Sequence, residues 1–191
     1  PCISTLREYT NTPLVLFPGN IAQFSPHADA LLFLSLLNAR DADMLITPHI
    51  KVAKQVLQSG IESIPMGYIL LDGGRISSVE KVSRCVPILQ NDVDHIVATA
   101  LAGQLLGKQL IYLEAGSGAK KVGSADIIRV VREQLQVPLI VGGGICTPQA
   151  MIQACEAGAD IIVIGNHFEQ HPEDLPIFIK QKHDICRLIR K

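Results

Sequence analysis

Features that mark several common protein classes are absent from this chain of 191 residues. No apolar run approaches the roughly 18 residues of a membrane-spanning helix, and we expect no signal peptide. The formal net charge is only -1, and no cluster of Lys and Arg longer than a pair occurs before the C-terminus. We therefore expect neither a membrane span nor a nucleic-acid partner, although a small pocket could still hold a phosphate.

The cysteine pattern lacks the signs of a disulfide framework or a zinc site. The number of cysteines is odd, they are widely spaced, and no CxxC motif occurs among Cys2, Cys85, Cys146, Cys155 and Cys186. Cysteines of this kind usually behave as small buried hydrophobic residues in a reducing compartment. We expect free thiols and a cytoplasmic protein.

The residues that are present describe a globular protein. Hydrophobic residues make up 48% of the chain and charged residues 18%, which is far from the composition of a disordered segment. The length is enough for one domain with a sizeable core, and no linker or low-complexity segment interrupts it. The sequence predicts a single domain over residues 1–191.

Strand-like and helical patterns alternate along the chain. Short apolar runs predict strands at 13–17, 28–37, 62–72, 109–114, 138–141 and 160–165, and periodic segments predict helices at 46–60, 91–107, 125–135 and 148–158, with a terminal helix through residue 190. We expect a loop or small hairpin at 73–88 and a loop at 166–171. Strands that are apolar throughout and alternate with helices indicate a parallel sheet covered on both faces.

Two α/β architectures fit six β/α units: an open doubly wound sheet and a (β/α)8 TIM barrel without its first two units. The glycine-rich loops follow the last strands, where a barrel places its phosphate site, whereas a doubly wound fold usually carries them after its first strand. The chain also opens as if within an amphipathic helix, with Ile3, Leu6 and Tyr9 on one face. We therefore expect a partial TIM barrel whose first two units are missing, with two open strand edges.

Two glycine-rich loops stand between a strand and a helix in consecutive units. "VGGGI" covers 141–145 and "IGNH" covers 164–167, and neither has the spacing of a P-loop or of GxGxxG. Glycine lets backbone N–H groups converge on an anion, and the start of the next helix adds a favourable dipole. One such loop could be only a tight turn, but two in register predict one phosphate site.

An acid stands where an apolar strand ends, in "LIYLEAGSGA" at 110–119. Glu114 could simply cap a loop N–H group. Tyr112, two residues earlier, projects to the same side of the strand, so a phenol and a carboxylate face one space. This pair suits a hydroxylated substrate, whose proton the carboxylate accepts while the phenol fixes its orientation.

Six motifs in order resemble the geranylgeranylglyceryl phosphate synthase family of TIM-barrel prenyltransferases. These motifs are "LFPGN", "ADALLFLSLLNAR", "PMGYIL", "YLEAGSGA", "PLIVGGGI" and "GADIIVIGN", and the resemblance runs from about residue 5 to about residue 169. The "YLEAGSGA" form is similar to the branch with archaeal and some bacterial enzymes rather than to the heptaprenyl-transferring branch.

The resemblance implies an enzyme of ether phospholipid biosynthesis. In such a prenyltransferase, sn-glycerol 1-phosphate attacks C1 of geranylgeranyl diphosphate, and diphosphate leaves. It implies Glu114 and Tyr112 as catalytic residues, with Glu114 as the base. It also implies a glycerol 1-phosphate site formed by Tyr112, Leu113, Glu114, Ala115, Gly116, Ser117, Gly118, Gly143, Gly144, Gly165 and Asn166.

The remaining expectations concern the leaving group, the prenyl chain and the assembly. Mg²⁺ would neutralise the diphosphate, but its ligands cannot be assigned, because the family's acidic first strand has no counterpart here. Phe17, Phe33 and Tyr68 are candidates for a prenyl groove, although Phe17 and Phe33 could equally be ordinary core. We expect a homo-oligomer. The alternatives are another phosphosugar-binding barrel enzyme and a non-catalytic or truncated phosphate-binding barrel derived from the family.

Overall fold

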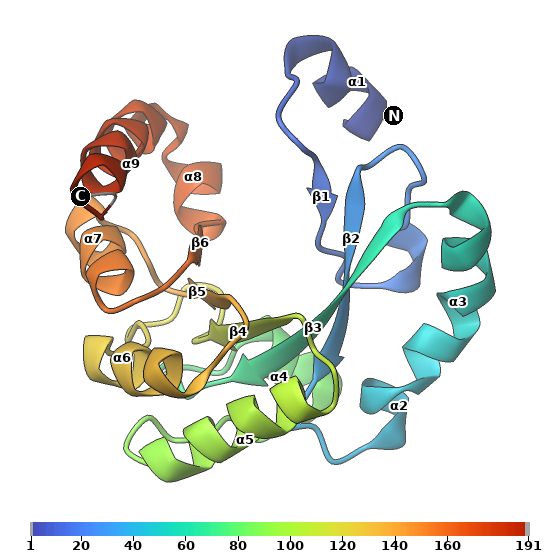
Figure 1. The fold of residues 1–191 in the computed structure, drawn as a ribbon, viewed down its shortest axis with the longest axis horizontal. Coiled ribbons are helices and arrows are strands. Elements are labelled where there is room, and N and C mark those ends of the chain that lie inside the picture. Colours follow the sequence, from blue (N-terminus) through green and yellow to red (C-terminus); the bar gives the residue numbers. More distant parts are fainter. Residues whose placement is uncertain (1, 190–191) are drawn as a thin grey trace.

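The computed structural model describes residues 2–189, and within them six parallel strands form one curved sheet (Figure 1). The strands are β1 (Val15–Leu16), β2 (Ala30–Leu36), β3 (Glu62–Leu70), β4 (Leu110–Glu114), β5 (Leu139–Gly142) and β6 (Ile161–Val163). Their order in the sheet follows their order in the chain, and β1 and β6 are its two edges. A doubly wound sheet reverses its strand order, so the barrel-type prediction is confirmed.

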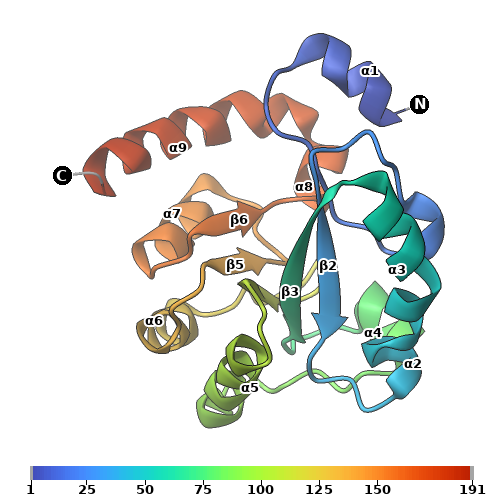
Figure 2. The same cartoon turned by 45° about the vertical axis from the view of Figure 1, so that its right-hand side comes forward.

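The helices are α1 (Cys2–Tyr9), α2 (Ala42–Leu45), α3 (Thr47–Ser59), α4 (Ser78–Ser83), α5 (Val93–Leu105), α6 (Ala125–Gln134), α7 (Pro148–Glu156), α8 (Asn166–Gln170) and α9 (Leu175–Ile189), with short 3-10 turns at Ile21–Gln23 and Pro172–Asp174. Figure 2 shows α3, α5, α6 and α7 on the convex outside of the sheet. None of the helices in residues 2–189 combines the length and the apolar character that crossing a bilayer requires.

The outward-facing residues of the strands form the larger part of the core. Ile69, Ile111 and Val141 are fully buried on this face, where they pack with side chains of the outer helices such as Ile96 and Ile128. Successive residues of a strand point to opposite faces. The next residue along each strand therefore turns to the concave side.

The concave side of β3, β4 and β5 carries a second apolar layer. Tyr68 pairs in register with Tyr112, and Tyr112 with Ile140. Two residues further toward the carboxyl ends of the strands, the register aligns Leu70, Glu114 and Gly142. Glu114 therefore stands directly above an aromatic layer, at the end of the sheet where β/α barrels carry their chemistry.

Two segments predicted as loops contain helices, and both predictions were wrong. Residues 73–88 include α4, which begins with a capping box: the Ser77 hydroxyl accepts from the Glu80 backbone N–H, and the Glu80 carboxylate accepts from that of Ser77. This S-x-x-E spacing is a helix-start signal that the sequence carried. Residues 166–171 include α8, which is too short to show a periodic pattern.

The helices at the two ends of the chain were predicted. α1 is a helix as expected, but none of its residues is buried, and Tyr9 is 83% exposed. The predicted apolar face is therefore at most partly covered within the described residues, since Ile3 is half-buried while Leu6 and Tyr9 are exposed. The terminal helix α9 is described to Ile189, so the predicted end at residue 190 lies outside the described residues.

Candidate active site

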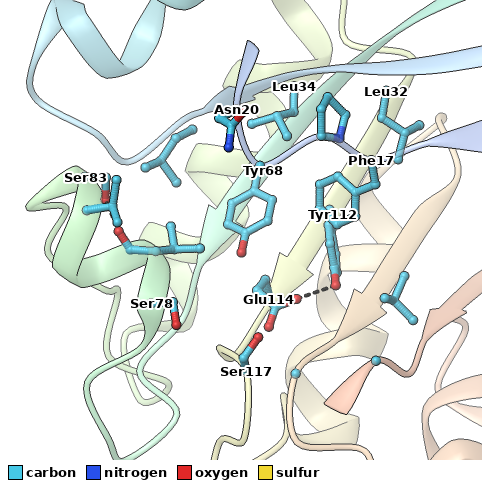
Figure 3. Close-up of a pocket in the computed structure, with 18 of the residues that line it drawn as sticks. Phe17, Asn20, Leu32, Leu34, Tyr68, Ser78, Ser83, Tyr112, Glu114 and Ser117 are labelled. Atoms are coloured by element: carbon cyan, nitrogen blue, oxygen red, sulfur yellow. Dashed lines mark hydrogen bonds between the residues drawn. The ribbon is translucent and has the colours of Figure 1, made fainter. Parts of the chain in front are cut away.

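A cavity of about 710 Å³ opens at the carboxyl ends of the strands (Figure 3). Its polar end contains Glu114, Ser117 and the two glycine-rich loops, and the remainder is lined mostly by apolar side chains from the β1 and β2 region, α3 and α4. A concave, largely apolar site with a few convergent polar groups is typical of a small-molecule pocket. The polar and apolar ends of the cavity suit a ligand that itself has one polar part and one apolar part.

Glu114 and Tyr112 project from β4 into the same cavity, as predicted, and they also form a hydrogen bond with each other, which was not predicted. The Tyr112 hydroxyl donates to one carboxylate oxygen of Glu114. The backbone N–H of Gly116 donates to the other oxygen at 2.7 Å. Only 8% of the Glu114 surface is exposed. The carboxylate is therefore held by two donors at the cavity wall.

Burial is the main influence on the protonation of this pair. Desolvation raises the pKa of Glu114 above its ordinary value, and the hydrogen bonds from Tyr112 and Gly116 oppose the rise. Burial and the neighbouring Glu114 charge both raise the pKa of Tyr112, so its phenol stays protonated and donating. A carboxylate with a raised pKa is a stronger proton acceptor than an exposed one.

Glycines of the first loop make room for this pair. A side chain at Gly142 would collide with the Tyr112 hydroxyl, and one at Gly143 would collide with a carboxylate oxygen of Glu114. Gly143 and Gly144 also have left-handed backbone angles, with φ of 84° and 75°. The triple glycine is therefore required both by the turn and by the approach of the loop to Glu114.

The second loop reaches the same cavity, as the sequence predicted. Gly165 and Asn166 follow β6 and line the cavity together with Gly143 and Gly144. A Cβ atom added at Gly165 would meet no atom within 4 Å, so this glycine borders open space. The arrangement offers the backbone of two adjacent loops to one ligand.

The segment after Glu114 enters the site only in part. Ser117 and Gly118 line the cavity, and the Arg75 guanidinium donates to the Gly118 carbonyl at 3.1 Å. The structure does not bring the Leu113 side chain into the cavity, because it alternates with Tyr112 and Glu114 along β4 and is buried in the outer core.

Ala115 and Gly116 are not among the cavity-lining residues either. Ala115 is buried and its N–H donates to the Gly142 carbonyl at 3.1 Å, which continues the sheet. The Gly116 N–H is used by Glu114. The backbone donors of these two residues are therefore occupied within the protein.

Aromatic rings cover the floor of the cavity beneath Glu114. The ring centroid of Tyr112 lies 5.1 Å from that of Tyr68 and 5.6 Å from that of Phe17. Phe33 lies further along the wall, with its ring edge-on to His49 at 4.6 Å. All three residues predicted for a prenyl groove, Phe17, Phe33 and Tyr68, line the cavity.

Sequence reasoning missed several cavity residues. Ser78, Val79, Val82 and Ser83 come from α4, the helix that was not predicted. His167 follows Asn166 and bonds to Asp174 at 3.0 Å. The capping box was an available signal for α4, but nothing in the sequence around His167 indicated the contact with Asp174.

The described residues do not offer a set of metal ligands. No group of three or more His, Cys, Asp or Glu side chains within the described part of the chain is placed to hold a metal ion. Among the described residues that line the cavity, Glu114 is the one carboxylate, and both of its oxygens accept hydrogen bonds from the protein. These residues therefore do not fit a magnesium centre on their own.

Comparisons with known proteins agree on one group of relatives. The PcrB family matches residues 2–182. A geranylgeranylglyceryl phosphate synthase of Spirosoma linguale is 46% identical over 174 residues, which are 91% of this chain and 70% of the relative. One from Zunongwangia profunda is 48% identical and covers 88% of this chain and 72% of that protein.

Solved structures give the same result. Wild-type GGGPS from Thermoplasma volcanium is 40% identical, with a TM-score of 0.81 over 86% of this chain and 66% of that one. The geranylgeranylglyceryl phosphate synthase of Thermoplasma acidophilum, solved with sn-glycerol-1-phosphate, is 38% identical with the same TM-score and coverage. The chain thus spans about two thirds of the length of the solved proteins it matches.

Proposed function

The chain belongs to the PcrB family, and we propose that it forms an ether bond between sn-glycerol 1-phosphate and geranylgeranyl diphosphate, with release of diphosphate. Relatives at 46–48% identity carry the name geranylgeranylglyceryl phosphate synthase, and a structural neighbour binds sn-glycerol-1-phosphate. The observation that carries the proposal is the buried Glu114–Tyr112 pair in a cavity whose polar end adjoins two glycine-rich loops.

Glu114 serves as the general base. In the reaction, the glycerol hydroxyl oxygen bonds to C1 of the prenyl group, the bond from C1 to the diphosphate oxygen breaks, and the hydroxyl proton passes to the Glu114 carboxylate. Burial raises the pKa of Glu114, which strengthens it as a proton acceptor. Tyr112 donates to the carboxylate and fixes its direction within the cavity.

The two glycine-rich loops hold the phosphate of the glycerol substrate. Gly143, Gly144, Gly165 and Asn166 border one side of the cavity, and glycine permits a phosphate oxygen to approach the backbone closely. No Lys or Arg is among the described residues that line the cavity. Backbone N–H groups therefore supply much of the binding in this part of the site.

The apolar end of the cavity holds the prenyl chain. Phe17 and Tyr68 beneath Glu114 and Phe33 further along the wall line the cavity, and burial of the chain against them excludes water from the reacting carbon. Mg²⁺ is the proposed partner of the diphosphate, and it would neutralise the charge of the leaving group when bound. The described residues do not supply its ligands, so no step is assigned to it.

A homo-oligomeric state and a cytoplasmic location complete the proposal. Both come from the sequence-based expectations above. Equilibrium sedimentation of the purified protein measures the first, and fractionation of cells that produce it measures the second.

Direct detection of the ether product tests the function. The protein is incubated with sn-glycerol 1-phosphate, labelled geranylgeranyl diphosphate and Mg²⁺, and the lipid product is identified by mass spectrometry. Formation of geranylgeranylglyceryl phosphate supports the proposal. Binding of glycerol 1-phosphate without transfer would support the non-catalytic alternative. If the protein neither binds glycerol 1-phosphate nor transfers the prenyl group, this substrate is excluded.

A further inference from the structure

Helix α3 has two apolar faces, and only one of them is used by the cavity. Pro48, Val52 and Val56 line the cavity. A second apolar row, spaced by four, three and four residues, does not line the cavity and consists of the N-cap residue Ile46 followed by Ile50, Ala53 and Leu57. Ile50 is 69% exposed and Leu57 83% exposed. We call this row the outer stripe of α3.

The outer stripe lies on the outside of the molecule. Figure 2 shows α3 at the edge of the convex face, next to α2 and without another helix packed over its outer side. An amphipathic helix of a globular protein usually presents charged and polar residues to water opposite its buried face. On α3, large apolar side chains occupy part of the water-facing side of the helix. The stripe therefore marks a contact surface.

The charges on α3 itself are positive, while the nearest acids along the chain are Asp41 and Asp43 before the stripe and Glu62 after it. α3 carries Lys51 and Lys54, both exposed, and no Asp or Glu from Thr47 to Ser59. On the other wall of the same cavity, α4 adds the exposed Lys81, and Arg84 directly follows the helix. The whole chain has a net charge of -1, so these helices concentrate positive charge near the cavity.

Glu80 is the one acid on α4, and its carboxylate is engaged by the Ser77 backbone N–H in the capping box. Val82, on the same helix, lines the cavity and is also 78% exposed. The rim of the cavity thus repeats the combination seen on α3, in which exposed apolar side chains alternate with cations.

We propose that the outer stripe of α3, with Lys51 and Lys54, docks the protein on the surface of an anionic lipid bilayer. An apolar row flanked by lysines matches a membrane interface, where the apolar side chains enter the acyl boundary and the cations meet anionic headgroups. A second copy of this chain fits less well. Two α3 helices that face each other would bring the lysines of both copies together without an acid on either helix.

The docking surface and the proposed reaction are linked through α3. The helix that would contact the bilayer also forms a wall of the cavity proposed for the prenyl chain, so a long apolar substrate or product has a short path between lipid and protein. This link rests on the proposed function. The lipid-binding surface itself does not, because its evidence is the stripe and the charges beside it.

Vesicle co-sedimentation without any substrate tests the proposal. Vesicles of phosphatidylcholine alone are compared with vesicles in which about a third of the lipid is phosphatidylglycerol, a proportion chosen to give an anionic surface potential. We expect binding to the anionic vesicles and much weaker binding to the neutral ones. Binding should fall as salt shortens the screening length from about 10 Å at 0.1 M to about 3 Å at 1 M.

Three double variants separate the contributions. Lys51→Gln with Lys54→Gln should weaken binding to anionic vesicles about twenty-five-fold, at about fivefold for each lysine. Ile50→Ser with Leu57→Ser should weaken it at least about tenfold by removing apolar contact. Leu105→Ser with Leu106→Ser is the matched control, because these side chains, 85% and 75% exposed, are comparably exposed but lie at the end of α5. The control should bind like the unmodified protein.

Circular dichroism confirms that each variant is folded, and light scattering after size exclusion gives the oligomeric state. Absence of binding to anionic vesicles, or equal binding by the α3 variants and the control, would overturn the proposal. So would a dimer that the Ile50→Ser and Leu57→Ser variant converts to a monomer, since the stripe would then contact a second copy. Because no substrate is present, none of these outcomes bears on the proposed reaction.

Discussion

Replacement of Glu114 by glutamine should reduce turnover and at the same time stabilise the fold. Glutamine keeps the shape of the side chain, and its amide can still bond to Tyr112 and to the Gly116 N–H, but it cannot accept the substrate proton. A positioned general base contributes about 10²–10⁴-fold to rate, or about 3–5 kcal/mol of the activation barrier. Turnover should fall by that factor, and glycerol 1-phosphate affinity should change much less.

The stability effect follows from the direction of the pKa shift. Burial raises the pKa of Glu114 in the folded protein above the ordinary glutamate value of about 4.3. The folded state then binds the proton more tightly than the unfolded chain. The stability associated with protonated Glu114 is complete below the ordinary pKa and is lost as pH rises through the folded pKa. The neutral amide introduced by Glu114→Gln resembles the protonated carboxyl group and escapes this loss.

Thermal unfolding and steady-state kinetics over pH measure both effects. The Tm of Glu114→Gln should equal that of the unmodified protein near pH 4 and exceed it at pH 7, because the ordinary pKa lies at about 4.3. Glu133→Gln is the control, since Glu133 is exposed on α6 and should show neither change. Near-normal turnover of Glu114→Gln across the pH range would refute the general-base role and leave Glu114 as a loop cap.

Three further substitutions test the loops around this pair. Gly144→Ala should weaken glycerol 1-phosphate binding in calorimetry and destabilise the fold by about 1–2 kcal/mol, because its φ is left-handed and its Cβ would lie 2.7 Å from the Ala119 carbonyl oxygen. Gly142→Ala should lower turnover as Tyr112→Phe does, since the added methyl group collides with the Tyr112 hydroxyl; unchanged turnover would contradict the role of that hydroxyl. Gly165→Ala should leave Tm unchanged because its Cβ meets open space, while a Tm loss as large as that of Gly144→Ala would contradict the described backbone.

The alternation along strands allowed much of the site to be predicted. Tyr112 and Glu114 are two residues apart on an apolar strand, so their common direction followed from strand geometry alone. The two glycine-rich loops followed consecutive strands, and parallel pairing brings such loops to one end of the sheet. Local patterns were sufficient wherever the residues of the site belong to one strand or to neighbouring strands.

Other parts of the site depend on contacts between distant segments. The role of α4 in the cavity wall was missed because a helix of this length shows no clear periodicity, although its capping box was visible. Leu113 was assigned with its motif as a whole, whereas alternation along β4 directs it into the outer core. The contact of His167 with Asp174 depends on how α8 and α9 pack, which a sequence pattern does not specify.

Titration of the protein with sn-glycerol 1-phosphate, in parallel for the unmodified chain and for Gly144→Ala, measures whether the two loops bind the phosphate. We propose that the phosphate lies against the loops at Gly143–Gly144 and Gly165–Asn166, in the cavity that also holds Glu114. We expect saturable binding by the unmodified chain and clearly weaker binding by the variant. Absence of binding by the unmodified chain, or equal affinity of the two proteins, would contradict this proposal.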